Sequence, residues 1–418
     1  MPEIRHLVFA VDALVVGVVV VDLLLGLPRR SHFKVERSFV GTWSHNRQER
    51  VRFHIDHHSV LPRRVTVVPD LMAALVTEMG AQVLSLPPRR RASVVFAVTA
   101  TERGVFEFGA LWIAAHSRLG LWRRHMRFGE STPLHVYPNL KQLSEYALLA
   151  RTNRLSLIGV RRFRRAGGDT EFERLRDYQT GDPLQRVDWK ATARRQALTV
   201  RDFQVSQSQN VIFMLDTGRM MASRHEAEGG EISLLDQAID AALMMAYVAL
   251  AQGDRVGLIA YSDSVHRYVP PKGGARHLNQ LIHAVHDLQP QLVESRHDEA
   301  FLYLQRKERK RCMACLFTSI IDQVNADVIQ AHVTKLHGRH LPMTVVLRDP
   351  GLHVYLDKPP VGEDALYRSG AAAMIANWRE EALRSLGTAG ALVVDSAADE
   401  LTPAVVSRYL EVKARHLL

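Results

Sequence analysis

Residues Asn210–Gly218 read NVIFMLDTG, and this stretch decides the fold of the C-terminal half of the chain. The five apolar residues Val211–Leu215 have the length and composition of a buried strand, and an aspartate, a threonine and a glycine follow them. Helical patterns and further apolar runs alternate from there to the end of the chain. This alternation predicts a doubly wound, mostly parallel α/β sheet over residues 206–418, with ligand sites at the carboxyl ends of its strands.

The predicted elements of this domain are few and regularly spaced. Strands are expected at Val211–Leu215, Arg255–Tyr261, Met313–Thr318, Met343–Leu347 and Ala391–Asp395, and helices at Leu234–Ala251, Leu278–Leu288, Val324–Leu336 and Thr402–Arg415.

The segment just before this domain, Gly167–Phe203, is dense in charge of both signs. It reads GGDTEFERLRDYQTGDPLQRVDWKATARRQALTVRDF, and it includes aromatic and apolar residues that a disordered tail would lack. Arginine–carboxylate pairs within it can fix one geometry. We therefore expect either a structural clasp, in which Tyr178 and Trp189 pack, or a docking surface for a partner. The candidate residues for these roles are Glu171, Glu173, Arg174, Arg176, Tyr178, Asp182, Asp188, Trp189, Lys190 and Arg194.

An apolar stretch near the N-terminus is long enough to cross a bilayer. Residues Leu7–Leu27 read LVFAVDALVVGVVVVDLLLGL, which predicts one transmembrane anchor within residues 1–30. Asp12 and Asp22 interrupt it, either as a functional pair inside the membrane or as residues that face the interface or pack against neighbouring structure.

The basic residues around this stretch predict its orientation. Arg29, Arg30, Lys34 and Arg37 follow it, whereas Arg5 alone precedes it. The positive-inside rule then places the soluble domains in the cytoplasm.

Short alternating runs fill the region between the anchor and the charged segment. They predict antiparallel strands and a small β-sandwich over residues 31–138, followed by a linking helix and the charged segment over 139–205. His57 and His58 are expected on opposite faces of a strand, which argues against a metal site there.

The net charge of +10 favours anionic lipid headgroups, acidic protein surfaces or nucleic acid as partners. Many basic residues lie near the N-terminal apolar stretch or in the opening part of the chain, which favours a membrane surface or an acidic protein over nucleic acid. The densest basic run is Arg161–Arg165, which suits either a solvated face or a partner-binding patch. Cys312 and Cys315 have CxxC spacing inside an apolar strand, and no second ligand pair exists for zinc. We expect two buried thiols in a reducing compartment.

The loop after the first strand of the α/β domain resembles that of a von Willebrand factor type A domain. In that family an Asp-x-Ser-x-Ser motif, with a threonine and an aspartate from two other loops, holds a divalent ion such as Mg²⁺. Here Asp216 is present, but Gly218 and Met220 stand at the two serine positions. A degenerate site would use Asp216, Thr217, Thr318, Ser319 and Asp322.

The charged segment, with the domain that follows it, resembles bacterial domain-of-unknown-function family 58. The resemblance implies an N-terminal membrane segment, a β-domain, a von Willebrand-type domain and a MoxR-type AAA ATPase as partner; it implies no biochemical activity. The first hypothesis is therefore a non-enzymatic membrane-anchored scaffold in complex assembly or envelope maintenance. The alternatives are a Mg²⁺-dependent binding module and an uncharacterised hydrolase, although no phosphate loop, GxSxG or HExxH motif occurs.

Overall fold

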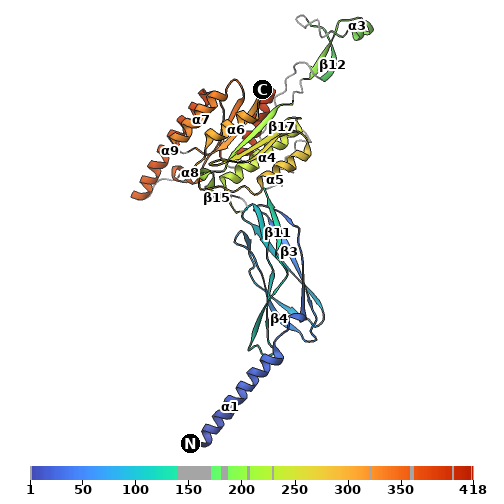
Figure 1. Ribbon diagram of the computed structural model, residues 1–418, viewed down its shortest axis with the longest axis vertical. Coiled ribbons are helices and arrows are strands. Elements are labelled where there is room, and N and C mark those ends of the chain that lie inside the picture. The colour runs from blue at the N-terminus through green and yellow to red at the C-terminus, as the bar shows by residue number, and fades with distance from the viewer. Residues whose placement is uncertain are drawn as a thin grey trace. The chain divides into compact units, whose positions relative to one another are not determined.

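The computed structural model describes residues 2–138, 171–179, 187–204, 208–227, 230–320, 322–357, 362–397, 400–415 and 417. It divides into two compact units, Met1–Asn139 with Glu228–Gly230, and Leu140–Ala227 with Glu231–Leu418. We call them the β unit and the α/β unit (Figure 1). The predicted linking helix, the arginine run Arg161–Arg165 and Asp182 lie outside the described residues.

The β unit begins with helix α1 (Pro2–Val21), a π turn (Asp22–Gly26) and a 3-10 turn (Arg30–His32). Its strands are β1 (Phe33–Ser38), β2 (Thr42–Ser44), β3 (Gln48–His57), β4 (Arg63–Pro69), β5 (Leu75–Thr77), β6 (Gln82–Leu86), β7 (Arg91–Ala100), β8 (Gly104–Phe108), β9 (Leu111–His116), β10 (Arg123–Phe128) and β11 (Thr132–Tyr137). They form sheets of order β1-β3-β7-β5, β10-β9-β4-β6 and β2-β11-β8.

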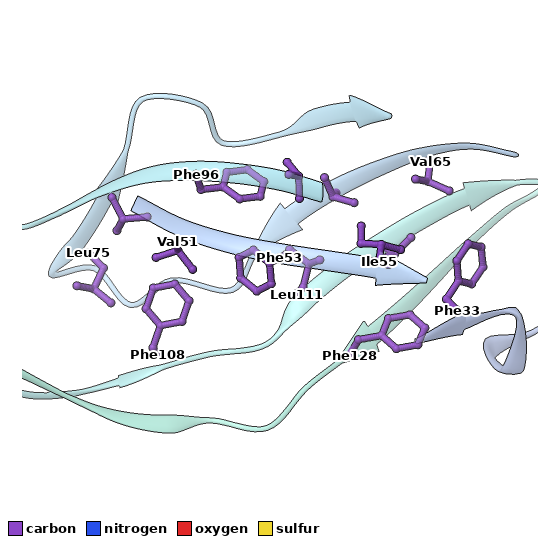
Figure 2. Close-up of a cluster of buried hydrophobic side chains, with 14 of the residues drawn as sticks. Phe33, Val51, Phe53, Ile55, Val65, Leu75, Phe96, Phe108, Leu111 and Phe128 are labelled. Carbon is purple, nitrogen blue, oxygen red and sulfur yellow. The ribbon is translucent and has the colours of Figure 1, made fainter. Parts of the chain in front are cut away.

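Strand β3 shows how the alternating sequence builds this unit. Val51, Phe53 and Ile55 are at most 1% exposed, because every second side chain of a strand points to the same face. Figure 2 shows them in one cluster with side chains of the other four-stranded sheet, such as Val65 and Leu111. The two sheets thus share a single core.

The same alternation separates the two histidines at the end of β3. His57 is buried and its Nδ1 lies 3.0 Å from the Pro87 carbonyl oxygen, whereas His58 is exposed. The prediction that they lie on opposite faces is confirmed.

The rest of the chain holds a charged hairpin and a sheet flanked by helices. Its elements are β12 (Glu171–Asp177), α3 (Trp189–Arg195), β13 (Thr199–Gln204), β14 (Asn210–Asp216), the 3-10 turn η5 (Arg219–Ala222), β15 (Arg224–Ala227), β16 (Gly230–Ser233), α4 (Leu234–Ala251), β17 (Arg255–Tyr261), β18 (Val265–Lys272), α5 (Ala275–Val285), α6 (His297–Lys307), β19 (Cys312–Thr318), α7 (Gln323–Leu336), β20 (Leu341–Leu347), α8 (Pro350–Asp357), α9 (Glu363–Thr388), β21 (Leu392–Ser396) and α10 (Leu401–Ala414).

The six-stranded sheet has the order β18-β17-β14-β19-β20-β21. All neighbours run parallel except the edge strand β18, which is antiparallel to β17. The predicted mostly parallel α/β sheet is therefore confirmed. The chain passes from β14 to β17 on one side and later to β19 on the other, so the strand order reverses at β14. Such a reversal opens a crevice at the carboxyl ends of the strands, where Asp216 lies.

Helix α4 covers the sheet and is fixed by local signals at both ends. The Ser233 hydroxyl accepts the Asp236 N–H while the Asp236 carboxylate accepts the Ser233 N–H, a capping box. Gly253, at φ 83°, ends it. Helix α4 is long and apolar enough to cross a membrane, but 67% of it is buried in the protein, so it is a core helix of the α/β unit.

Candidate functional site

The crevice at the end of β14 is centred on the Asp216 carboxylate, which is 1% exposed. Its Oδ1 accepts the Gly218 N–H at 2.8 Å and the Ser295 hydroxyl at 2.6 Å. Its Oδ2 accepts the Thr318 hydroxyl at 2.6 Å. Ser295 lies between α5 and α6 and Thr318 ends β19, so one carboxylate joins three segments that are distant in sequence. We call this arrangement the Asp216 clasp.

Gly218 shows why the motif serine is absent from its position. A Cβ atom there would lie 2.0 Å from the Ser295 Oγ and 3.0 Å from the Val293 carbonyl oxygen. The Gly218 φ of −79° suits any residue, so the restriction is steric. The Ser295 hydroxyl therefore occupies the space that a side chain at position 218 would need.

The side chains of the other predicted metal ligands form hydrogen bonds with backbone groups. Thr217 donates its hydroxyl to the Tyr261 carbonyl oxygen at 2.9 Å, and the Ser319 hydroxyl is directed to the Leu347 carbonyl oxygen at 3.5 Å. Asp322 caps α7 by accepting the Asn325 N–H at 2.8 Å. Of the predicted set, Asp216 and Thr318 are joined by a hydrogen bond between their side chains.

This arrangement does not fit a magnesium ion. Mg²⁺ requires near-octahedral oxygen coordination, with carboxylates among its usual protein ligands. The crevice offers one carboxylate, and both of its oxygens already accept hydrogen bonds from protein donors. Within the described ranges, no group of three or more His, Cys, Asp or Glu residues is placed to hold a metal. Both carboxylate oxygens of Asp216 are thus hydrogen-bonded to groups of the protein itself.

Two residues beside the clasp were missed by sequence reasoning. His297 begins α6, is 3% exposed, and places its Nδ1 2.8 Å from the Tyr261 hydroxyl. Burial lowers the pKa of His297, and this outweighs the opposing influence of the Asp216 and Asp322 carboxylates. The imidazole is thus held neutral. Neither Ser295 nor His297 has a local sequence signal, because their roles depend on segments far along the chain.

A serine–histidine pair also joins the loop after β17 to strand β18. The Ser262 Oγ is 2.5 Å from the His266 Nε2 and 2.9 Å from the Gln291 Oε1. Ser262 is fully buried, so its hydroxyl has no open approach for a substrate. We interpret the pair as a contact that fixes the loop.

The described part of the charged segment forms a hairpin and a short helix. β12 pairs with β13, and Asp188 begins α3 by accepting the N–H groups of Lys190 and Ala191, both at 3.0 Å. Tyr178 is half-buried. Trp189 is 65% exposed, because α3 has no buried residue and offers no core to receive it.

The structure describes the side chains of only some of the remaining charged candidates. Lys190 and Arg194 are exposed on α3 beside Trp189. Glu171, Glu173, Arg174 and Arg176 have their backbone in β12, but their side chains lie outside the described residues, as does Asp182.

An open cleft of about 530 Å³ lies elsewhere, between β21 and α10. Its charged residues pair with nearby groups: Arg408 and Arg415 both bind Glu411, and Asp395 binds Arg348 and Arg379. The cleft is therefore no better candidate for chemistry than the Asp216 clasp. The two cysteines of β19 are buried as predicted, and burial raises the pKa of Cys312 to about 12.

Comparison with known proteins supports the family resemblance. Residues 174–369 match the family described as "Protein of unknown function DUF58". An uncharacterized protein of Mycobacterium tuberculosis, Rv1480, is 24% identical over 208 residues, which are 48% of this chain and 61% of that protein. The uncharacterized protein YeaD of Bacillus subtilis is 26% identical over 128 residues, 31% of this chain and 32% of that protein. The chain thus matches less than two thirds of the length of these relatives.

Two solved structures show partial likeness. BatB from Bacteroides thetaiotaomicron has a TM-score of 0.30 at 11% identity and covers 50% of this chain and 100% of its own. Native alpha-2-macroglobulin from Escherichia coli has a TM-score of 0.23 at 16% identity, over 25% of this chain and 16% of its own. Both TM-scores lie below 0.5, so neither likeness shows the fold of this chain.

Proposed function

We propose that this chain, whose residues 174–369 match the DUF58 family, is a non-enzymatic, membrane-anchored interaction protein. In this proposal α1 holds it in the bacterial inner membrane, with the β and α/β units on the cytoplasmic side. The α/β unit binds a protein partner, and the family resemblance makes a MoxR-type AAA ATPase the first candidate. The complex would serve protein assembly or envelope maintenance.

The observation that carries the binding role is the exposure of Trp189. A tryptophan that is 65% exposed leaves a large apolar surface in water, and tryptophan is enriched at the energetic centres of protein interfaces. The Asp188 cap fixes the first turn of α3, and the exposed Lys190 and Arg194 add positive charge to the same short helix. A partner with an apolar pocket rimmed by carboxylates would complement this surface.

The Asp216 clasp supports a non-enzymatic role. The carboxylate, its two hydroxyl partners and the neutral His297 are all engaged within the protein, and Ser262 is buried. Catalysis needs a group that can reach a substrate in a suitable protonation state. The hydrogen bonds of Asp216 instead hold the end of β14, the end of β19 and the connection before α6 together.

The side chains of α1 support the anchor. Nine apolar residues between Val8 and Val21 are each at least 42% exposed, namely Val8, Phe9, Val11, Leu14, Val15, Val16, Val18, Val20 and Val21. They are distributed around the helix, so water would surround apolar surface on every side. A bilayer removes that surface from water over the length of such a helix.

A binding measurement on the full chain in nanodiscs tests the partner role. A purified MoxR-type ATPase from the same organism is expected to bind the wild type, and Trp189→Ala is expected to weaken this by at least about tenfold, as for a central interface tryptophan. Tyr367→Ala is the matched control, since Tyr367 on α9 is 76% exposed and aromatic. An ATPase that fails to bind the wild-type chain would refute the proposed partner.

A hydrolase is the second candidate function: Ser262, whose Oγ lies 2.5 Å from the His266 Nε2, would act as nucleophile in a conformation in which the loop after β17 opens. Ester and peptide substrates offered to the full chain would reveal it. Turnover that disappears in Ser262→Ala, in a protein that is still folded, would replace the interaction role with a catalytic one.

A further inference from the structure

The end of the β unit from which α1 emerges carries connecting segments with positive charge only. Phe33 pairs with His57, Arg91 with Asp56, and Leu86 with Arg63, so residues 27–32, 58–62 and 87–90 lie at this end. The pairing of His116 with Arg123 adds residues 117–122. These four segments contain five exposed arginines and no aspartate or glutamate: Arg29, Arg30, Arg89, Arg90 and Arg118. We call this surface the basic end.

One loop of the basic end is bonded to the last turn of α1 and to the π turn after it. The Trp122 indole Nε1 donates to the Val19 carbonyl oxygen at 3.1 Å. The buried Asp22 carboxylate accepts the Ser117 hydroxyl at 2.5 Å and the Leu119 N–H at 3.0 Å. Asp22 is thus a packing residue that holds the helix against the strands. Wherever the end of α1 lies, the loop 117–122 lies at the same level.

The same loop exposes apolar side chains at its tip. Leu119 is 62% exposed, Leu121 51% and Trp122 38%. Tryptophan in the headgroup region, with leucines able to reach the acyl chains and arginines able to reach phosphates, is the composition of an interfacial membrane contact.

The opposite end of the β unit has a different composition. Its connecting segments, residues 45–47, 78–81 and 101–103, mix charges of both signs, with Glu78 and Glu102 beside Arg47 and Arg103. Met79 is 61% exposed there, close to the value for Leu119. Exposed apolar residues therefore occur at both ends, but only the basic end combines them with uniform positive charge.

We propose that the basic end binds the surface of the bilayer, with arginines on anionic phospholipid headgroups and the tip of the loop 117–122 inserted into the interface. The inference rests on the proposed anchoring by α1 and adds the lipid class that the chain selects. The energetic basis is charge complementarity together with burial of apolar surface. The β unit would then be held against the membrane, rather than tethered at a distance from it.

A fluorescent probe on the full chain tests the inference. Cys312 and Cys315 are buried, so an introduced surface cysteine can be labelled selectively. Leu121→Cys, with Met79→Cys as matched control, is labelled with an environment-sensitive dye. Each variant is reconstituted into nanodiscs of phosphatidylcholine alone or of a phosphatidylcholine–phosphatidylglycerol mixture. Brominated lipid serves as quencher, and circular dichroism confirms the fold.

At position 121 we expect the dye emission to shift to shorter wavelength and to be quenched, and both effects should be stronger with phosphatidylglycerol. At position 79 we expect no shift and no quenching. Arg89→Glu/Arg90→Glu should remove the dependence on phosphatidylglycerol. Equal signals at the two positions, or an unquenched position 121 in a chain that has entered the discs, would overturn the inference while leaving the anchor intact. A chain that never enters the discs would instead refute the anchor.

Discussion

The carboxylate of the Asp216 clasp is buried, whereas the charged groups of the basic end are exposed to solvent. The clasp buries one carboxylate and supplies it with three donors from three segments. The basic end leaves five arginines in solvent with no carboxylate on the same connecting segments. Buried polar groups must be satisfied within the protein, whereas exposed charges of one sign remain available to a partner. The difference indicates that the crevice serves stability and that the surfaces serve binding.

Removing the central carboxylate should have the largest effect. Asp216→Ala leaves the Ser295 and Thr318 hydroxyls and the Gly218 N–H without their acceptor, and we expect a loss of about 3 kcal/mol in the free energy of unfolding. Denaturant unfolding in detergent measures it. Asp327→Ala, at an exposed position of α7, should change stability by less than about 0.5 kcal/mol. Equal effects would mean that the clasp is not structural.

Restoring the motif serine should also destabilise the crevice. Gly218→Ser brings a Cβ to within 2.0 Å of the Ser295 Oγ, and overpacking of this kind costs about 2 kcal/mol. The double variant Gly218→Ser/Ser295→Ala should recover part of the loss, because the obstructing hydroxyl is gone. Additive losses in a double-mutant cycle would contradict the steric account.

The neutral His297 predicts a pH dependence of smaller size. Because burial lowers its pKa below 6.5, the unfolded chain takes up the proton first, and stability contributed by the neutral ring is lost as pH falls below 6.5. One such group contributes a slope of at most about 1.4 kcal/mol per pH unit. Unfolding between pH 7 and pH 5 should show a shallower slope in His297→Gln than in the control His283→Gln, which lies at an exposed position of α5. Identical slopes would mean that the buried ring does not titrate as described.

Substitutions at the basic end should have the smallest effect on the free energy of unfolding. Arg89→Glu/Arg90→Glu changes two exposed side chains, so the free energy of unfolding should stay within about 0.5 kcal/mol of the wild type. The same denaturant titration measures it. A large destabilisation would show that these arginines are held by the protein, and the contrast with the clasp would disappear.

The sequence predicted the sheet well where a single apolar run determines a buried element. β17 and α4 have the predicted bounds, because Arg255–Tyr261 and Leu234–Ala251 are apolar runs that begin and end at turn or cap residues. Helix α6 was missed because HDEAFLYLQRK is mostly polar, and edge strand β18 because VHRYVPPK carries two prolines.

The candidate site was harder to predict, for a physical reason. Asp216 follows directly from the end of a buried strand, but Ser295 lies in a connection without periodicity, and only the folded sheet brings it to Asp216. For Trp189 the sequence left two roles open, packing in a structural clasp or part of a docking surface, and its 65% exposure depends on α3 having no core to receive it. Local patterns predicted the elements, whereas contacts between distant segments decided the site.

The most direct test compares two variants for binding of the MoxR-type ATPase in nanodiscs. Trp189→Ala removes the exposed ring, and Thr318→Val removes a hydroxyl that a metal-dependent site would need. Both must first be shown to be folded. Our account predicts that Thr318→Val binds as the wild type does and that Trp189→Ala binds at least about tenfold more weakly. Retained binding in Trp189→Ala together with lost binding in Thr318→Val would contradict it and would place function at the Asp216 crevice.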